Sequence, residues 1–154
     1  MTAATVVCVG AVVRRGDAVL LVRQSPDHSL AGQWTVPWGL LENGESPLAA
    51  ALREVEEEGG VRAVVDGLLG VQELSEPWPG WIALVYLCSH AAGEPEPRDS
   101  ETDGARYYTL AELDALGEPV EPWSAWLVRR VLAGRYTLTA VDTSNPLGGH
   151  GSFL

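Results

Sequence analysis

Residues 46–60, with the sequence SPLAAALREVEEEGG, carry both the start and the stop signals of a single helix. Ser46 has a side chain suited to an N-cap, and Pro47 would occupy the first helical position, where its missing N–H costs nothing. Gly59 and Gly60 end the pattern, because glycine readily adopts the left-handed conformation that closes a helix. The helix separates two parts of the chain, and both parts are rich in strand-like apolar runs.

The remaining apolar runs mostly have the length and composition of strands. Before the helix, TVVCVGAVVRR and AVLLVRQ are joined by Arg15-Gly16-Asp17, which is typical of a hairpin turn. After the helix, the expected strands are VRAVV, LLGVQEL, WIALVYLCS, ARYYTL and a short TLTAV, with PWSAWLVRRVLAG as a second helix. This order predicts an α/β (α+β) sandwich with a mixed central sheet between helices.

The chain of 154 residues suits one domain, which we expect over residues 1–142, followed by a mobile C-terminal tail over residues 143–154. Residues 24–46 form a long connection rich in Pro and Gly, with a short strand expected around QWTVP. Connections of that length in a compact domain are uncommon and usually functional.

The net charge of −11 constrains the partners. So acidic a surface argues against nonspecific binding to duplex nucleic acid, because such binding depends on neutralising phosphates, and no nucleic-acid partner is expected. A small phosphate-bearing molecule stays compatible, provided that a divalent cation reconciles it with clustered carboxylates. No apolar run approaches the roughly 20 residues that span a bilayer, so no membrane partner is expected. The first residues resemble a strand rather than a signal peptide.

Two cysteines, Cys8 and Cys88, lie in separate strand-like runs. Two isolated thiols form no disulfide framework and have no zinc-ligand spacing. We interpret them as buried and reduced, which favours a cytoplasmic protein. The sequence leaves the oligomeric state open, a homodimer included.

Three glutamates on the predicted helix form one patch. Glu54, Glu57 and Glu58 follow the i, i+3, i+4 spacing, so their side chains share one side of the helix, and Arg53 and Glu56 should point elsewhere. The predicted core face lies opposite and comprises Leu48, Ala51, Leu52 and Val55. Such a cluster suits a hard cation such as Mg²⁺, although a solvated acidic helix end is the alternative explanation.

A longer sequence pattern favours a cation site over a solvated helix end. From Gly39 it has five intervening residues, Glu45, seven more residues, and then REVEEEGGV from Arg53 to Val61. This resembles the Nudix box of the Nudix hydrolases at its seven fixed and two aliphatic positions, over 23 residues. The preceding GQWTVP is similar to the Gly-x-Trp-x-x-Pro segment common in these enzymes. The resemblance extends over residues 3–141 and implies the Nudix α/β/α sandwich.

The resemblance implies a reaction. Nudix hydrolases, both MutT-like and ADP-ribose-type, cleave a nucleoside diphosphate linked to another group, using Mg²⁺ or Mn²⁺. The substrate would be a small nucleotide: a nucleotide sugar, ADP-ribose, a dinucleotide or a nucleoside triphosphate. The residues that match the family's metal ligands are Glu54, Glu57, Glu58 and the carbonyl of Gly39. Arg53 and Glu45 match a pair that links the loop to the helix.

The general base differs among family members. It is Glu57 of the box or a glutamate from a later loop, for which Glu101 is the candidate, also as a further metal ligand. An exposed loop carboxylate is the alternative explanation for Glu101, and Asp99 and Asp103 are nearby competitors.

Aromatic residues are the candidates for binding the substrate. Trp38 replaces a glycine that many relatives carry; it either packs under the loop or lines the pocket, and we expect a negative φ there with Gly39 supplying the bend. Trp78 and Trp81 in SEPWPGW, which is partly similar to a motif of NADH-type members, either stack on a base or pack a hairpin against the core.

Other side chains add little to the site. The three histidines, at positions 28, 90 and 150, have no ligand spacing and are interpreted as incidental. The alternative function is a Nudix-fold nucleotide-binding or regulatory domain without catalysis. Degenerate box glutamates would favour it, and none is degenerate here.

Overall fold

A mixed β-sheet organises the protein. The computed structural model describes residues 4–148 and 151–154, and within these ranges the sheet has eight strands and the order β3-β2-β1-β6-β5-β8, with β4 on β1 and β7 on β2. The strands are β1 (Val7–Arg15), β2 (Ala18–Gln24), β3 (Trp34–Thr35), β4 (Trp38–Leu40), β5 (Arg62–Glu73), β6 (Ile82–Ala92), β7 (Thr102–Thr109) and β8 (Thr139–Ala140). The described helices are α1 (Pro47–Gly59), α2 (Leu110–Ala115) and α3 (Pro122–Leu132).

Strand β1 is the centre of the sheet. It forms the predicted hairpin with β2, in which Arg15 lies opposite Ala18. It also pairs parallel with β6 and antiparallel with β4. Parallel and antiparallel neighbours on one strand confirm the predicted mixed sheet.

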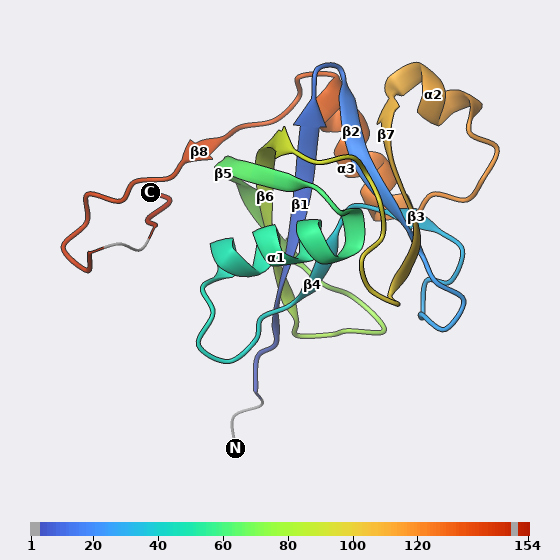
Figure 1. Cartoon of the computed structure of the whole chain (residues 1–154). Helices are drawn as coiled ribbons and strands as arrows, with labels where there is room; N and C mark the ends of the chain where they lie inside the picture. The colour runs from blue at the N-terminus through green and yellow to red at the C-terminus, as the bar shows by residue number, and fades with distance from the viewer. Residues whose placement is uncertain (1–3, 149–150) are drawn as a thin grey trace.

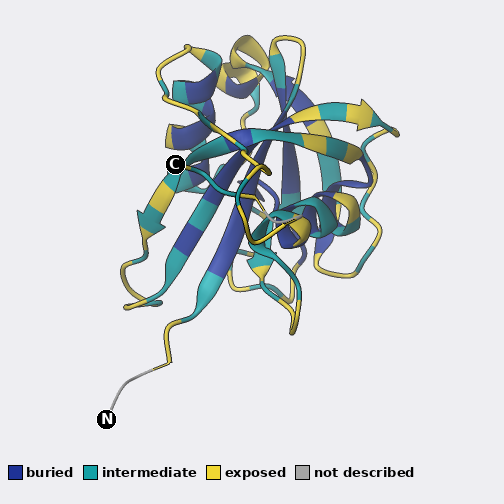
Figure 2. Cartoon of the chain, turned by 90° about the vertical axis from the view of Figure 1, so that its left-hand side faces the viewer, coloured by how far each residue is buried: buried dark blue, intermediate teal, exposed yellow. Residues whose placement is uncertain are grey.

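The two faces of the sheet carry separate apolar clusters because side chains alternate along a strand. On β1, Val9 and Val13 pack with Ala51 and Val55 of α1, whereas Val12 packs with residues of α3. Helices α1 and α3 therefore cover opposite faces, with α1 in front of β1 and α3 behind it in Figure 1. Figure 2 shows the buried residues gathered on the central strands and on the helix sides that face them. The predicted sandwich is confirmed.

Two elements differ from the sequence prediction. The runs VRAVV and LLGVQEL form one strand, β5, because register shifts between Val65 and Gly67 and between Leu68 and Gly70 let the chain continue through both glycines. Helix α2 was not predicted. Its N-terminus is a capping box in which the side chains of Thr109 and Glu112 accept each other's backbone N–H.

The end of the chain returns to the domain. Asp142 pairs with Ser152, and the ring of Phe153 lies 5.6 Å from that of Tyr86, measured between centroids. The boundary predicted at residue 142 stays a prediction, and His150 lies outside the described residues. Cys8 and Cys88 are buried and form no disulfide with each other, as expected. No helix in the described ranges has both the length and the apolar character needed to cross a bilayer.

Candidate active site

Helix α1 begins and ends where the sequence predicts. The Ser46 hydroxyl accepts the N–H of Ala49 at 3.2 Å, and Gly60 closes the helix with φ of 71° while its N–H donates to the Glu56 carbonyl. A Cβ at Gly60 would also collide with the backbone of Glu96, so glycine is required there twice over. These contacts fix α1, and with it the box glutamates, relative to the sheet.

The glutamate patch is largely buried, although the sequence placed it opposite the core face of the helix. Glu54 is 5% exposed and Glu58 is 1% exposed, whereas the Glu57 side chain is 43% exposed. Helical periodicity identifies the side of α1 that faces the sheet, but it does not show that β4 covers a second side, where Gly39 contacts Glu54. Two of the three glutamates in the patch are therefore buried carboxyl groups.

Arg53 points into this patch, whereas the sequence predicted that it would point away. Its Nε and Nη2 donate to the two carboxylate oxygens of Glu45 at 2.9 and 2.7 Å, and Nη2 also donates to the Leu40 carbonyl at 2.9 Å. Its Nη1 donates to Glu54 at 2.8 Å and to Glu57 at 3.1 Å. All five N–H groups of the guanidinium are thus engaged. The expected contact between Arg53 and Glu45 is present, while its role in catalysis stays a prediction.

The environment changes the acidity of these carboxyl groups in opposite directions. Hydrogen bonds from Arg53 lower the pKa of Glu45. Burial raises the pKa of Glu54 to about 7, although the Arg53 hydrogen bond opposes the change. Burial also raises the pKa of Glu58 well above its ordinary value, opposed by the Trp38 N–H, which donates to Glu58 at 2.9 Å. Without a further cation, α1 therefore holds two carboxyl groups that resist ionisation.

One oxygen in this patch has no partner. Oε2 of Glu54 is buried and accepts no hydrogen bond from any described group. Such an atom is costly in a protein interior unless a donor or a cation reaches it. Within residues 4–148 and 151–154, however, no three acidic, histidine or cysteine side chains converge as a ready ligand set. In this arrangement Arg53 Nη1 donates to both Glu54 and Glu57, and the Trp38 N–H donates to Glu58.

The donor set nevertheless fits a divalent cation. Its members are carboxylate oxygens, the ligands that Mg²⁺ and Mn²⁺ prefer, and the unpartnered Glu54 oxygen belongs to the patch. Gly39 itself lies on β4 next to the same carboxylate, while the role of its carbonyl stays a prediction. The residues present are therefore chemically suitable for such an ion.

Gly39 is required for a reason that differs from the predicted one. Trp38 has a negative φ, as expected, since no described residue other than glycine has a positive φ. Gly39 does not have a positive φ either, and it supplies no left-handed bend. It pairs with Val9 in a regular antiparallel register, and a Cβ there would collide with the Glu54 carboxylate. Glycine thus permits β4 to approach Glu54 closely.

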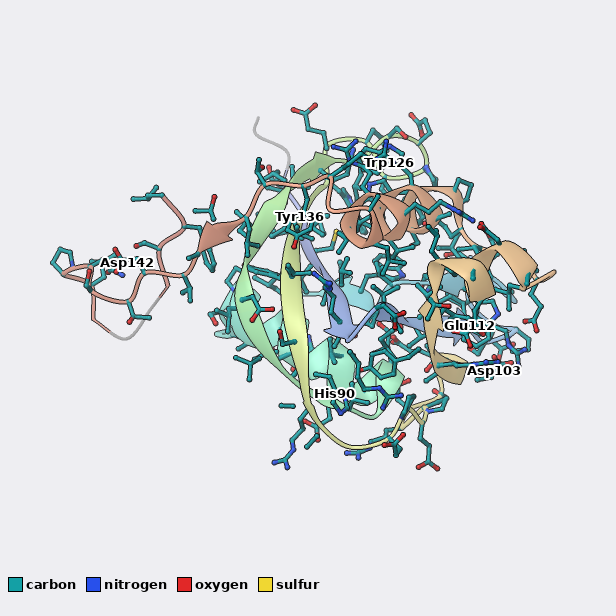
Figure 3. All side chains as sticks on the ribbon, turned by 90° about the horizontal axis from the view of Figure 1, so that it is seen from above. His90, Asp103, Glu112, Trp126, Tyr136 and Asp142 are labelled. Atoms are coloured by element: carbon teal, nitrogen blue, oxygen red, sulfur yellow. The ribbon has the colours of Figure 1, made fainter. Side chains whose placement is uncertain are left out.

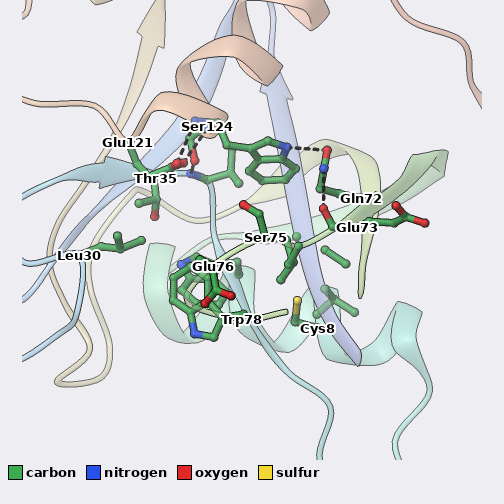
Figure 4. Close-up of a pocket in the computed structure, with 17 residues that line it drawn as sticks. Cys8, Leu30, Thr35, Gln72, Glu73, Ser75, Glu76, Trp78, Glu121 and Ser124 are labelled. Carbon is green, nitrogen blue, oxygen red and sulfur yellow. Dashed lines mark hydrogen bonds between the residues drawn. The ribbon is translucent and has the colours of Figure 1, made fainter. Parts of the chain in front are cut away.

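Two adjoining cavities lie beside this patch. The first, the acidic pocket, has a volume of about 400 Å³, and among its lining residues are Gly39, Arg53, Glu54, Glu57 and Glu101. The second, the apolar pocket, has a volume of about 250 Å³, and its lining includes Cys8, Val36, Leu74, Ala83 and Trp123. Trp38 and Trp78 line both cavities, and Figure 4 shows Trp78 among the side chains of the apolar pocket.

The predicted aromatic residues come together at these cavities. The Trp38 and Trp78 rings meet edge to face with centroids 6.0 Å apart, and Trp81, which lines the acidic pocket, lies 6.4 Å from Trp78. Trp38 is half-buried and lines the acidic pocket, while its role in substrate binding stays a prediction. Trp123, which the sequence did not indicate, is held in the apolar pocket by an N–H donated to Gln72 at 3.0 Å.

The competitors of Glu101 are engaged elsewhere. Asp103 accepts a hydrogen bond from Arg23 at 2.7 Å and lies toward the outer edge of β7, as Figure 3 shows. Asp99 accepts the N–H of Glu101 itself at 3.0 Å. Of these three carboxylates, only Glu101 lines the acidic pocket.

His28 is a pocket residue that sequence reasoning dismissed. It lines the acidic pocket, and its ring lies edge-on to Trp38 with centroids 5.8 Å apart. The only available signal was its place in the long connection between β2 and the box, because a lone histidine has no ligand spacing.

Comparison with known proteins gives a consistent result. A model of the NUDIX domain matches residues 4–131. A MutT-like protein of Streptomyces ambofaciens is 36% identical over 104 residues, which cover 68% of this chain and 63% of that protein. The NAD-capped RNA hydrolase NudC of Vibrio vulnificus is 33% identical over 117 residues, 75% of this chain but only 41% of that protein. The chain thus spans less than two thirds of the length of these relatives.

Solved structures agree with the fold. A NUDIX hydrolase from Nitrosomonas europaea superposes with a TM-score of 0.73 at 24% sequence identity, over 88% of this chain and 93% of that one. At this identity the likeness concerns the fold alone, and it supports the arrangement of α1, β1 and β4 around the candidate site.

Proposed function

The chain is a member of the Nudix hydrolase family, and from this premise we propose that it hydrolyses a diphosphate bond in a small nucleotide with a divalent cation. The substrate class is a nucleoside diphosphate linked to another group, or a nucleoside triphosphate. One observation carries the proposal: Glu54, which has a buried carboxylate oxygen without a hydrogen-bond partner, lines the acidic pocket together with Glu57.

The residues that would hold Mg²⁺ or Mn²⁺ are Glu54, Glu57, Glu58 and the carbonyl of Gly39, with Glu101 as a further ligand. When bound, such an ion neutralises the diphosphate and polarises the bond that breaks. The net charge of −11 supports a need for it, because a polyphosphate would otherwise meet only repulsion at these carboxylates.

The chain's own groups handle the proton. A water molecule attacks phosphorus, the bridging P–O bond breaks, and the attacking water gives up a proton. Glu57 and Glu101 are the acceptors that we propose, because both line the acidic pocket and neither side chain is buried. Arg53 keeps the loop of Glu45 against α1 and thereby positions Glu54 and Glu57.

The apolar pocket is where we propose that the nucleobase of the substrate binds. A diphosphate in the acidic pocket would leave the nucleoside beside Trp38 and Trp78, which line both cavities. Indole rings stack well on any base, since every base has a π-face. Trp81, adjacent to Trp78, would extend the same surface.

A substrate panel tests the proposal. Nucleotide sugars, ADP-ribose, dinucleotides and nucleoside triphosphates are incubated with the protein and Mg²⁺ or Mn²⁺, and the products are identified by mass. We expect cleavage at a diphosphate bond of at least one compound, and none in excess EDTA. Binding of a nucleotide without turnover under any of these conditions would instead favour a regulatory domain, although Glu54, Glu57 and Glu58 are all present.

A further inference from the structure

We infer that His28, on the loop between β2 and β3, donates a hydrogen bond from Nε2 to a phosphate oxygen of the substrate in the acidic pocket. The inference rests on the proposed function, and it concerns a residue outside the Nudix box.

The acidic pocket has few side chains able to receive an anion. A diphosphate presents oxygens that only accept hydrogen bonds, and four of the charged residues that line the pocket are carboxylates: Glu42, Glu54, Glu57 and Glu101. Arg53 is the cation in the lining, and its five N–H groups already donate to protein oxygens. Arg53 could reach a phosphate only by releasing the loop or a box glutamate. A donor from another element, such as the His28 ring or the Ser29 hydroxyl, could reach a phosphate without that loss.

The ring of His28 has its proton on the nitrogen that could serve. The Leu30 N–H donates to Nδ1 of His28 at 3.1 Å, and a nitrogen that accepts a hydrogen bond carries no proton. In the neutral ring the proton is then on Nε2. No described group of the protein accepts a hydrogen bond from Nε2. Nδ1 accepts from the loop backbone and His28 lines the acidic pocket, so we infer that the Nε2–H, which diverges from Nδ1 across the ring, is the group that the pocket can use.

The loop holds this donor in place before substrate arrives. The His28 N–H donates to the Ser25 carbonyl, and the His28 carbonyl accepts the Ala31 N–H, both at 3.0 Å. The imidazole also lies at 87° to the Trp38 ring, an edge-to-face contact. A donor fixed by three such contacts loses little entropy on binding.

The substitution His28→Asn separates the proposed contact from the structural role of the residue. The asparagine Oδ1 can still accept the Leu30 N–H, as in an Asx-turn, but the shorter side chain has no donor at the position of Nε2. His28→Gln, whose amide nitrogen reaches further, is the rescue variant. The matched control is His90→Asn, which removes a histidine that is hydrogen-bonded to Tyr107 and does not line the acidic pocket.

The readouts are KM and kcat for the best substrate of the panel and, independently of turnover, the Kd for methylenediphosphonate with Mg²⁺ by calorimetry. For His28→Asn we expect KM and Kd to rise about tenfold, because a hydrogen bond to a charged group is lost. We expect kcat to stay within about twofold, because the contact also forms in the ground state. The melting temperature should be unchanged, His28→Gln should recover part of the affinity, and His90→Asn should behave as the wild type.

Wild-type KM and Kd in His28→Asn would overturn the inference, as would a fall in kcat alone or a wild-type protein that does not bind methylenediphosphonate. A wild-type protein that binds this compound but hydrolyses no member of the panel would refute the proposed function instead. In that case the Kd values alone decide the role of His28.

Discussion

The substitution Glu54→Gln tests whether burial of the Glu54 carboxyl group makes the stability of the protein depend on pH. Glu54 is 5% exposed, and its pKa is raised by burial from 4.5 to about 7. Between these values the folded protein retains a proton that the unfolded chain has already released. The free energy of unfolding of the metal-free protein should therefore fall as the pH rises through this window. The raised pKa of Glu58 acts in the same direction.

The magnitude follows from the shift. A difference between 4.5 and about 7 corresponds to about 3 kcal/mol as an upper limit for the free energy lost across the window. Glutamine has nearly the shape of glutamic acid and does not titrate, and its Oε1 can keep the hydrogen bond from Arg53. The free energy of unfolding of Glu54→Gln should therefore equal that of the wild type at about pH 5 and exceed it by up to about 3 kcal/mol at about pH 8.

Urea denaturation in EDTA across this pH range measures both proteins, with the m-value checked for constancy. The matched control is Glu56→Gln on the outer side of α1, where Glu56 pairs with Arg98 at 3.1 Å and both side chains are about half exposed. This control should keep the pH dependence of the wild type. Adding Mg²⁺ at about pH 8 should stabilise the wild type by mass action, and it should stabilise the Glu54→Gln variant to a smaller extent.

Equal pH dependence in Glu54→Gln and the wild type would refute the reasoning, because the titrating group would then lie elsewhere. A wild-type protein that is more stable at about pH 8 than at about pH 5 in EDTA would also refute the reasoning.

Four further predictions concern the same site. Glu57→Gln should cut turnover by orders of magnitude while circular dichroism shows an unchanged fold; full activity in this variant, or in excess EDTA, would contradict the metal assignment. Gly39→Ala should lower both the melting temperature and turnover, with a cost of about 1–3 kcal/mol in urea denaturation, because the new Cβ displaces Glu54. Arg53→Ala should cost about 3 kcal/mol by the same assay, since it leaves partly buried carboxylates unpaired, and wild-type stability would argue against the contact. Trp38→Gly should raise KM more than it lowers kcat, because the indole lines both pockets; a loss of thermal stability with unchanged kinetics would assign Trp38 to packing alone.

The sequence was most informative where local rules decide the structure. Ser46 and Gly60 define the ends of α1 through contacts within a few residues of themselves, and the hairpin at Gly16 depends on one turn. Alternation along β1 likewise determines which residues face each helix. These features confirm the predicted sandwich.

The surroundings of the box depend on contacts between distant segments. Helical spacing grouped Glu54 and Glu58 correctly, but their burial arises from β4, which joins the sheet through β1. The same packing brings the guanidinium of Arg53 to five oxygens on the helix and the preceding loop, a geometry that no spacing encodes. For His28 the decisive contact is with Trp38, ten positions later in the chain.

The engagement of Arg53 has a consequence for the order of events at the site. Its Nη1 already supplies positive charge between Glu54 and Glu57, so the protein carries its own counter-ion, and we expect it to fold without a metal. Loading the proposed divalent ion would then be an exchange of one cation for another. The incoming ion must compete with a guanidinium, and its apparent affinity for the free protein is reduced by that competition. A nucleotide that arrives with the ion already on its phosphates brings ligands of its own to the exchange, so substrate and metal are expected to bind together rather than in sequence.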